Sequence, residues 1–325
     1  MTDTFEGRIG FVGLGNVGAK LAGSILRNGM ALTVVDLNAT RVVDFVGRGA
    51  SRAANPAELA RACDVVITCL PSPAACAAVV EGPDGLVEGM GPGKTWLEMS
   101  TTDAGELKRL AGVIEATSAR AVECPVSGGC HRAATGNISI LVGGAREDFD
   151  AMLPLLTRLG RRIMHAGPLG AASELKVMTN YLATANLVTL SEALVTMVKA
   201  GHAPSTVLDA ITISSGNSFV AETEGQVILN GSRDIEFTMD LVSKDIGLFQ
   251  SIAEAHDVPL EVSPLLVDIF KDGEARYGPR ELSPNIIRRL EEATGVAVLA
   301  DGYPAILEDD EPEEPGYEVR GGKAV

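Results

Sequence analysis

Aromatic residues are scarce in this chain: phenylalanine, tryptophan and tyrosine make up 4% of 325 residues, with a single tryptophan. Packing must therefore rely mainly on Ala, Val and Leu. The five cysteines form no CxxC pair and have no zinc-ligand spacing. The first residues lack the basic and apolar regions of a signal peptide. These absences argue against a disulfide-rich secreted domain, and they predict a reduced, cytoplasmic protein with no metal site.

Positive charge is also in short supply, because 27 Lys and Arg face 43 Asp and Glu, for a net charge of −16. This balance argues against nucleic acid or an anionic membrane as a partner. We also expect no membrane span, since no apolar run approaches the roughly 18–20 residues that a span needs. Residues 301–325 hold eight of the acids and two basic residues. We expect a solvated acidic tail, either disordered or lying along a partner subunit.

The most informative stretch lies near the amino terminus, where a short apolar strand runs into a glycine-rich loop and a helix. Gly13 permits a tight turn, Gly15 lets backbone N–H groups approach a pyrophosphate, and Gly18 lets the helix pack closely on the strand. The phosphates are expected at the start of the helix, at Asn16 and Val17. The order of these elements predicts a dinucleotide site. The alternative is a glycine-rich βαβ unit without a ligand.

Asp36 ends the second strand and bears on which dinucleotide binds. It stands 21 positions after Gly15, near the ~20 expected for a carboxylate that binds the adenosine ribose. That carboxylate would repel a 2′-phosphate, and Leu37 and Asn38 offer no cation to attract one. Arg41 lies close enough in the sequence to complicate this argument. We predict NAD in preference to NADP.

The chain length predicts two domains. Up to residue 167, short apolar strand candidates alternate with helical segments, which indicates an α/β fold with a Rossmann-type, doubly wound parallel sheet. The strand candidates are 9–12, 32–35, 65–70, 95–99, 121–126, 138–142 and 162–165.

Strand signals nearly stop after residue 167, and an all-helical C-terminal domain is expected. Residues 170–200 form one long helical pattern, and breakers separate the helices that follow it. Those helices are expected near 204–213, 218–229, 239–256, 261–276 and 283–294. We therefore predict a dinucleotide-binding domain (1–167), a helical domain entered by a long interdomain helix (168–300) and the acidic tail (301–325).

The ends of parallel strands meet at one edge of a sheet, where ligands bind. The loops after three strands should therefore form a cleft with the glycine loop. These loops contain Leu70 and Pro71, Ser100 and Thr101, and the segment Ser127, Gly128 and Gly129, here called the substrate loop. The glycines of the substrate loop expose backbone N–H groups and its serine adds a hydroxyl, a combination that suits a carboxylate. The alternative is a flexible turn.

Lys176 and Asn180 stand four residues apart on the long helix, so both side chains project from one face. A lysine can exchange a proton with a substrate oxygen if desolvation lowers its pKa toward neutrality. The asparagine amide can orient a hydroxyl or a carboxylate. Together they could serve a hydride transfer. The alternative is a surface lysine and a helix-capping asparagine.

Six motifs in order give the sequence a wider resemblance. They are IGFVGLGNVG (9–18), DVVITCLP (64–71), LEMSTT (97–102), PVSGG (125–129), GAASELKVMTNYL (170–182) and LVSKDIGL (241–248). Over residues 8–295 the chain resembles the β-hydroxyacid dehydrogenase family.

The resemblance implies that Lys176 is the catalytic general acid or base, that Asn180 orients the substrate, and that the substrate loop holds the substrate carboxylate. It also implies that the helical domain binds substrate and forms homodimers or homotetramers. Further, it implies contacts to the nicotinamide and its ribose from Leu70, Pro71 and Thr101, with closure over the cofactor by Lys244.

The sequence departs from the family pattern around the substrate. Glu123 stands where Asp is usual, Cys130-His131 follow the substrate loop, Thr179 replaces an Asn, and Phe249 replaces an Ala. We expect His131 to face solvent, the alternative being contact with a polar substrate group. These departures leave the identity of the substrate open.

The predicted function is an NAD-dependent oxidoreductase that transfers a hydride between nicotinamide and the 3-hydroxyl of a small carboxylate substrate resembling 3-hydroxyisobutyrate. One alternative is an imine reductase on the same fold, against which Lys176 argues. Another is a phosphogluconate-type decarboxylating dehydrogenase, which usually carries a histidine where this chain has Thr179. The third is a redox-inactive dinucleotide-binding sensor, which would have no use for Lys176 and Asn180.

Overall fold

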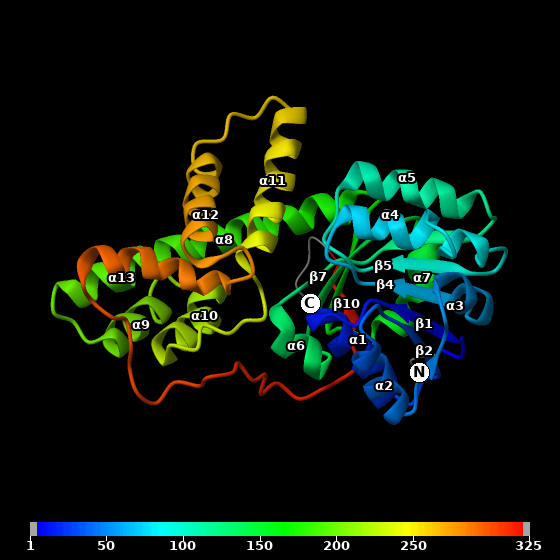
Figure 1. Ribbon diagram of the computed structural model, residues 1–325, viewed down its shortest axis with the longest axis horizontal. Helices are drawn as coiled ribbons and strands as arrows, with labels where there is room; N and C mark the ends of the chain where they lie inside the picture. Colours follow the sequence, from blue (N-terminus) through cyan, green and yellow to red (C-terminus); the bar gives the residue numbers. More distant parts are fainter. Residues whose placement is uncertain (1–4, 321–325) are drawn as a thin grey trace. The chain divides into compact units, whose positions relative to one another are not determined.

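The computed structural model describes residues 5–320 and divides into two units (Figure 1). The first unit runs to Lys176 and includes the chain from Asp309 onward, whereas the second is Val177–Glu308. The chain thus leaves the first unit within its longest helix and returns to it at the acidic tail.

The first unit is built on one sheet with the strand order β10-β9-β8-β6-β5-β4-β1-β2-β3, and β7 pairs with β8. The strands are β1 (Ile9–Val12), β2 (Leu32–Val35), β3 (Ser51–Arg52), β4 (Val65–Thr68), β5 (Thr95–Glu98), β6 (Arg120–Glu123), β7 (Val126–Ser127), β8 (Ser139–Gly143), β9 (Arg162–Gly167) and β10 (Tyr317–Glu318). β8 is antiparallel to β6 and β7, and the other pairs are parallel. The predicted Rossmann-type sheet is confirmed. The strand expected over 121–126 is instead two strands, because Pro125 has no N–H to donate to the ladder.

Helices cover both faces of this sheet. They are α1 (Asn16–Arg27), α2 (Ala39–Gly47), α3 (Pro56–Ala62), α4 (Pro73–Glu81), α5 (Ala104–Glu115), α6 (Gly129–Thr135) and α7 (Arg146–Leu156). Neighbouring strand residues alternate between two cores. Ile67 packs with α1 and α7, whereas Val66 packs with α3, α4 and α5.

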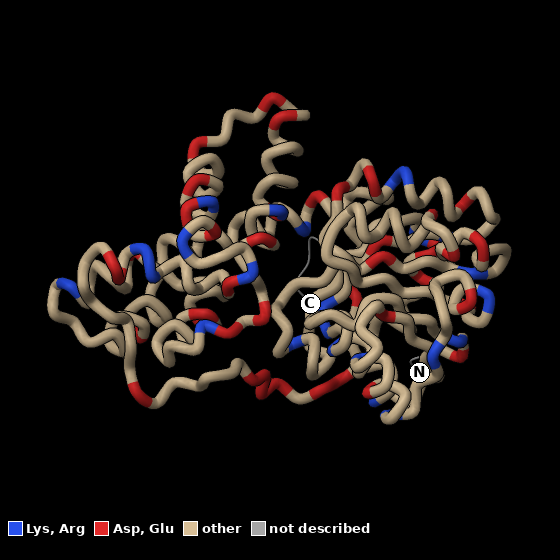
Figure 2. Tube along the Cα trace, in the orientation of Figure 1, with Lys and Arg blue, Asp and Glu red and all other residues tan. Residues whose placement is uncertain are grey.

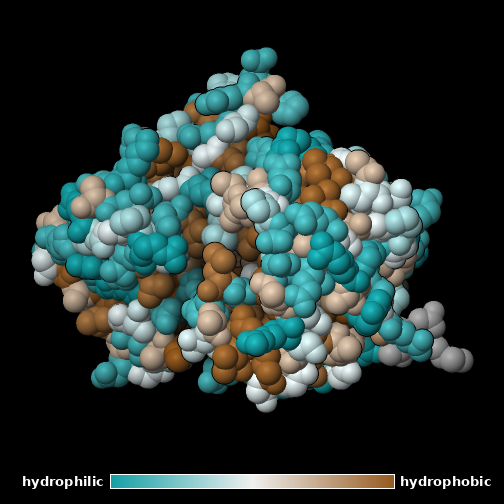
Figure 3. All heavy atoms as spheres, turned by 45° about the vertical axis from the view of Figure 1, so that its right-hand side comes forward, coloured by the Kyte–Doolittle hydropathy of each residue, from teal (hydrophilic) through white to brown (hydrophobic). Residues whose placement is uncertain are grey.

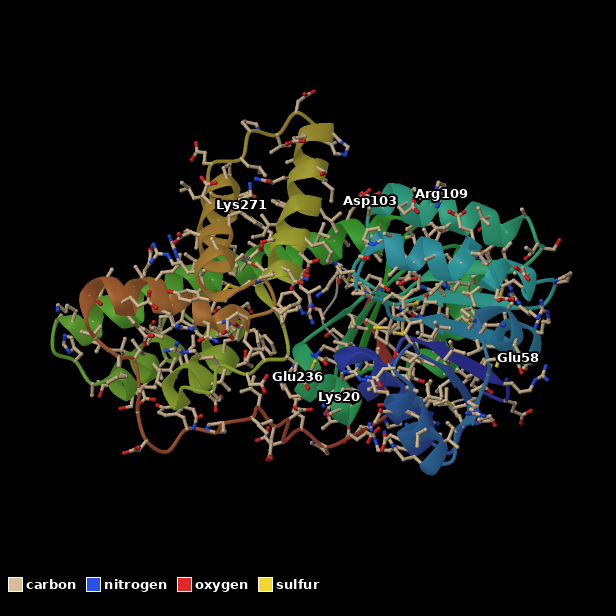
Figure 4. All side chains as sticks on the ribbon, in the orientation of Figure 1. Lys20, Glu58, Asp103, Arg109, Glu236 and Lys271 are labelled. Carbon is tan, nitrogen blue, oxygen red and sulfur yellow. The ribbon has the colours of Figure 1, made fainter. Side chains whose placement is uncertain are left out.

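Several helices begin at a capping side chain. Asp103, labelled in Figure 4, accepts a hydrogen bond from Glu106 N at the start of α5.

The second unit is helical, as predicted. It holds most of α8 (Ala171–Lys199), followed by α9 (Pro204–Thr212), α10 (Phe219–Asn230), α11 (Met239–Ala255), α12 (Ser263–Tyr277), the 3-10 helix η2 (Ser283–Ile287) and α13 (Arg288–Thr294). The single helix expected over 283–294 is thus divided between η2 and α13.

By length and composition alone, helix α8 is long and apolar enough to cross a membrane. The expectation that the chain has no segment of this kind was therefore wrong. Its side chains Leu187, Leu190 and Leu194 are buried in the core of the second unit. A buried core helix meets the same length and composition criteria as a membrane span. On the face shown in Figure 3, hydrophobic and hydrophilic residues are interspersed among the described residues.

The acidic tail has an arrangement that the sequence analysis did not foresee. Residues 301–308 belong to the second unit, whereas residues 309–320, rich in acids in Figure 2, pack on the first unit of the same chain. The residues after 320 lie outside the described part. β10 extends the sheet parallel to β9. Tyr317 N donates to the Arg161 carbonyl (2.9 Å) and Val319 N to the Ile163 carbonyl (2.7 Å). The tail therefore covers a sheet edge that would otherwise expose unpaired backbone groups.

Candidate active site

The glycine loop leaves room where a pyrophosphate is expected. Gly13 has φ +97°, and a Cβ there would lie 2.4 Å from the Cys69 carbonyl oxygen. A Cβ on Gly18 would lie 2.1 Å from the Gly13 carbonyl oxygen, so α1 packs directly on the turn. A Cβ on Gly15 would meet nothing closer than Arg41, at 3.8 Å. The space beside Gly15 is therefore open.

Helix α1 begins at this open space. Gly15 is its N-cap and has no side chain to bond the amides of the first turn. Asn16 is exposed and Val17 half-buried at that turn. The N-terminus of a helix favours an anion, through its N–H groups and its dipole. These residues fit the phosphates of a dinucleotide.

Asp36 lies beside the same loop. Its carboxylate accepts hydrogen bonds from Leu14 N (2.5 Å) and Asn38 N (2.7 Å), which fix it at the end of β2. Arg41 also reaches the loop, where its guanidinium donates to the Leu14 carbonyl. The corner that would hold the adenosine ribose thus has an anion and a cation, although Leu37 is fully exposed and brings no charge.

The strand ends expected to share a rim do so. Val12, Thr68, Glu98 and Glu123 are aligned in register across β1, β4, β5 and β6. The next loops are joined by a hydrogen bond from Leu70 N to Ser100 Oγ (2.7 Å). Beside that bond, Leu70 and Thr101 are half-buried and Pro71 is exposed.

A buried carboxyl group that sequence reasoning did not single out lies beneath this rim. Glu98 is 1% exposed and accepts hydrogen bonds from Thr68 Oγ1 (2.5 Å) and Ser100 N (2.7 Å). Trp96 Nε1 donates to the same Thr68 hydroxyl (2.8 Å). Burial raises the pKa of Glu98 above its usual value. The signal in the sequence that could have revealed this group is an acid at the end of an apolar strand. In the structure, its hydrogen bonds fix the backbone that leads into Thr101.

Lys176 and the substrate loop come together although 49 residues separate them in the chain. Lys176 Nζ donates to Ser127 Oγ (3.3 Å), and the lysine is only 6% exposed. Gly128 and Gly129 have φ values of +129° and +87°, a backbone region that favours glycine. The hydroxyl and glycine backbone of the loop thus lie beside the amine of Lys176.

Glu123 holds the helix that carries Lys176. This fully buried carboxylate accepts hydrogen bonds from Gly170 N (2.6 Å), Ala172 N (3.0 Å), Ser173 N (3.0 Å) and the Ser173 hydroxyl. Burial raises the pKa of Glu123, and these four bonds limit the rise. An acid here satisfies N–H groups that the first turn of α8 cannot pair internally. In the sequence alone, Glu123 stands out only as a departure from the family pattern.

His131 does not simply face solvent as expected. Its ring lies against the backbone of the substrate loop, within 2.9 Å of where a Cβ on Gly129 would stand. The residue is half-buried, and burial lowers the pKa of the imidazole. Cys130 beside it is buried. Among residues 5–320, no group of His, Cys, Asp and Glu is arranged to hold a metal ion.

In the second unit, Asp245 links two of the predicted site residues. Asn180 Nδ2 donates to one carboxylate oxygen (2.5 Å), and Lys244 Nζ lies 2.8 Å from the other. Asp245 is 2% exposed, so it fixes both groups from a buried position. Phe249 stacks on Tyr181 with ring centroids 4.3 Å apart. Asp245 lies in the motif LVSKDIGL, where no local pattern indicates a role for it.

Two family models match the chain. Residues 8–167 match the NAD-binding domain of 6-phosphogluconate dehydrogenase. Residues 170–290 match a domain described as NAD-binding of NADP-dependent 3-hydroxyisobutyrate dehydrogenase. Together the two matches take in the sheet apart from β10, α8 and most of the helical unit.

Individual relatives match over most of their length. The 2-(hydroxymethyl)glutarate dehydrogenase of Eubacterium barkeri is 33% identical over 292 residues, 90% of this chain and 97% of the relative. The mitochondrial 3-hydroxyisobutyrate dehydrogenase of Mus musculus is 29% identical over 270 residues, 81% of each protein. The crystal structure of 3-hydroxyisobutyrate dehydrogenase from Salmonella typhimurium superposes with a TM-score of 0.80 at 26% identity, covering 88% of this chain and all of that one.

Proposed function

Because the chain belongs to the β-hydroxyacid dehydrogenase family of NAD(P)-dependent oxidoreductases, we propose that it oxidises the 3-hydroxyl of a small 3-hydroxy acid, with NAD as the preferred cofactor. The observation that carries this proposal is the buried contact between Lys176 and Ser127. It places a proton-carrying group against a loop suited to a carboxylate. The two relatives named as dehydrogenases of 3-hydroxyisobutyrate and 2-(hydroxymethyl)glutarate act on acids of this class.

Each residue then has one task in the reaction. The N–H groups and hydroxyl of the substrate loop bind the carboxylate and orient the acid. Lys176 Nζ accepts the proton of the 3-hydroxyl during oxidation and returns it during reduction. The positive charge that the amine gains with this proton stabilises negative charge that develops on the substrate oxygen. Asn180, one turn further along α8, orients that oxygen.

The cofactor site fits a dinucleotide, because the space beside Gly15 and the first turn of α1 accept a pyrophosphate. A bound nicotinamide cofactor supplies the hydride acceptor for oxidation and the donor for reduction. Preference for NAD is supported by the carboxylate of Asp36 at the end of β2. The guanidinium of Arg41 beside the loop is a cation that could attract a 2′-phosphate, so the experiment below compares NAD with NADP. Closure by Lys244 and assembly into homodimers or homotetramers stay predictions.

The first experiment measures turnover of a panel of acids with NAD and with NADP. The panel contains 3-hydroxyisobutyrate, 2-(hydroxymethyl)glutarate, serine, glycerate and 3-hydroxypropionate. We expect activity on at least one acid and a higher kcat/KM with NAD. Activity with NADP alone would refute the role given to Asp36, and inactivity on every acid would refute the substrate class.

A lysine variant tests the mechanism. Lys176→Ala should lower kcat by about 10²–10⁴, the contribution of a positioned general acid or base, while NAD affinity stays within a few-fold. Lys199→Ala is a matched control, since Lys199 lies at the other end of the same helix, where its Nζ donates to the Thr294 carbonyl (2.7 Å). Unchanged turnover in Lys176→Ala would overturn the role of Lys176 as the general acid or base, whereas a wild type without turnover would favour a binding protein without redox activity.

A further inference from the structure

The C-terminal segment 309–318 is bonded to the helix that follows the substrate loop. Arg132 on α6 lies 3.2 Å from a carboxylate oxygen of Glu311. Thr135, the last residue of α6, donates to the Asp309 carboxylate. Asn137 Nδ2 donates to that same carboxylate (2.7 Å) and to the Glu311 carbonyl (2.9 Å). Asn137 is 1% exposed, so these bonds are shielded from water on one side.

Further contacts fix the segment itself to the first unit. Glu313 pairs with Arg27 at the end of α1 (3.2 Å), and Glu318 pairs with Arg146 on α7 (2.6 Å). Glu314 pairs with Arg161 just before β9. The backbone pairing of β10 with β9 adds a register that isolated ion pairs lack. Segment 309–318 is thus anchored to the first unit at several points, so the segment that bonds α6 is itself held in place.

The position of α6 determines the position of the substrate loop. The helix begins at Gly129, the last residue of the loop. On the other side, Ser127 pairs with Ser139 of β8. A helix of seven residues is not stable on its own and depends on tertiary contacts. Helix α1 contacts α6, and the segment adds bonds to Arg132 and Thr135 in the second half of the helix.

The segment also lies outside the part of the chain that the family models describe, since the match ends at residue 290. Its contacts to α6 thus join a matched part of the chain to a part outside the match. We propose that segment 309–318 is a positioning brace that fixes α6 and the substrate loop in the geometry that binds the substrate carboxylate. The expected effect on KM rests on the proposed function, whereas the expected effect on the position of α6 and the substrate loop does not.

The test is a double variant, Asp309→Ala with Glu311→Ala, which removes the side-chain contacts to α6 and leaves β10 in place. We expect KM for the acid to rise at least five-fold, with kcat and NAD affinity within two-fold of the wild type. Hydrogen exchange should become faster in the peptide that spans residues 127–137. Glu314→Ala is the matched control, because it removes an ion pair of the same segment that does not involve α6.

Each outcome decides the matter. Unchanged exchange in residues 127–137 would overturn the brace, and faster exchange with unchanged KM would overturn its role in substrate binding. If KM rose as much in Glu314→Ala as in the double variant, general destabilisation would explain the effect and the brace would be overturned. The same holds if the double variant lost NAD affinity as much as affinity for the acid. Exchange is measured without substrate, so a wild type inactive on every acid would refute the proposed function while the brace is still judged by exchange.

Discussion

Two glycines of the cofactor loop should respond in opposite ways to the same methyl group. Gly15→Ala places a Cβ in open space, with its nearest neighbour 3.8 Å away and a backbone φ of −64° that alanine adopts readily. Gly18→Ala places a Cβ 2.1 Å from the Gly13 carbonyl oxygen. The first methyl fills space that we assign to the pyrophosphate, whereas the second forces α1 away from the turn.

The magnitudes follow from these distances. For Gly15→Ala, reduced freedom of the unfolded chain contributes about 0.4–1 kcal/mol and offsets the small cost at the N-cap, so stability should not change. The methyl should cost one or two charge-assisted hydrogen bonds to the phosphates, about 3 kcal/mol or about 100-fold in Kd. For Gly18→Ala, overpacking costs about 1–3 kcal/mol, of which better helix propensity returns up to about 1 kcal/mol. Its free energy of unfolding should therefore fall by about 1–2 kcal/mol if the backbone shift stays small.

The single tryptophan makes the assay selective. Trp96 is 1% exposed in β5, so its fluorescence during urea unfolding reports on the first unit alone. NADH titration gives the affinity of each variant. An unchanged Kd in Gly15→Ala would refute the assignment of the open space to the pyrophosphate. A Gly18→Ala variant as stable as the wild type would refute the packing argument.

Two further predictions concern buried carboxylates. Glu98→Gln should retain both hydrogen bonds, since its amide can accept from Ser100 N and donate to Thr68 Oγ1. Because burial raises the pKa of Glu98, the folded unit binds this proton more tightly than the unfolded chain does. The wild type should therefore lose free energy of unfolding relative to Glu98→Gln as the pH rises above about 4, the ordinary pKa of a carboxyl group, and urea titrations at several pH values that show a constant difference would contradict this. Asp245→Asn should lower kcat/KM at least about ten-fold, because its amide would turn a donor toward the donor of Asn180 or of Lys244; steady-state rates unchanged within two-fold would contradict it.

The sheet could be predicted from the sequence where local pattern decides the structure. β1 and β2 begin and end as expected, since each is a short apolar run followed by a glycine or an acid. β3 and β10 have two residues each and no apolar alternation, so no local pattern could reveal them. The tail was predicted to be solvated because its charge is visible in the sequence, while its partners are not. Arg27 and Arg146, for example, lie 286 and 172 residues from the acids they bond.

Three buried acids explain why the site could be predicted only in part. Glu98, Glu123 and Asp245 are each at most 2% exposed. Each fixes a residue that the sequence patterns indicate. Glu98 bonds the loop before Thr101, and Glu123 bonds the first turn of α8 before Lys176. Asp245 contacts Asn180 and Lys244 directly. A desolvated carboxylate is costly unless polar groups surround it, so each of these acids fixes its partners in one arrangement. Motif spacing therefore reveals the groups that meet a ligand, whereas the groups that orient them become visible only when distant segments are brought together.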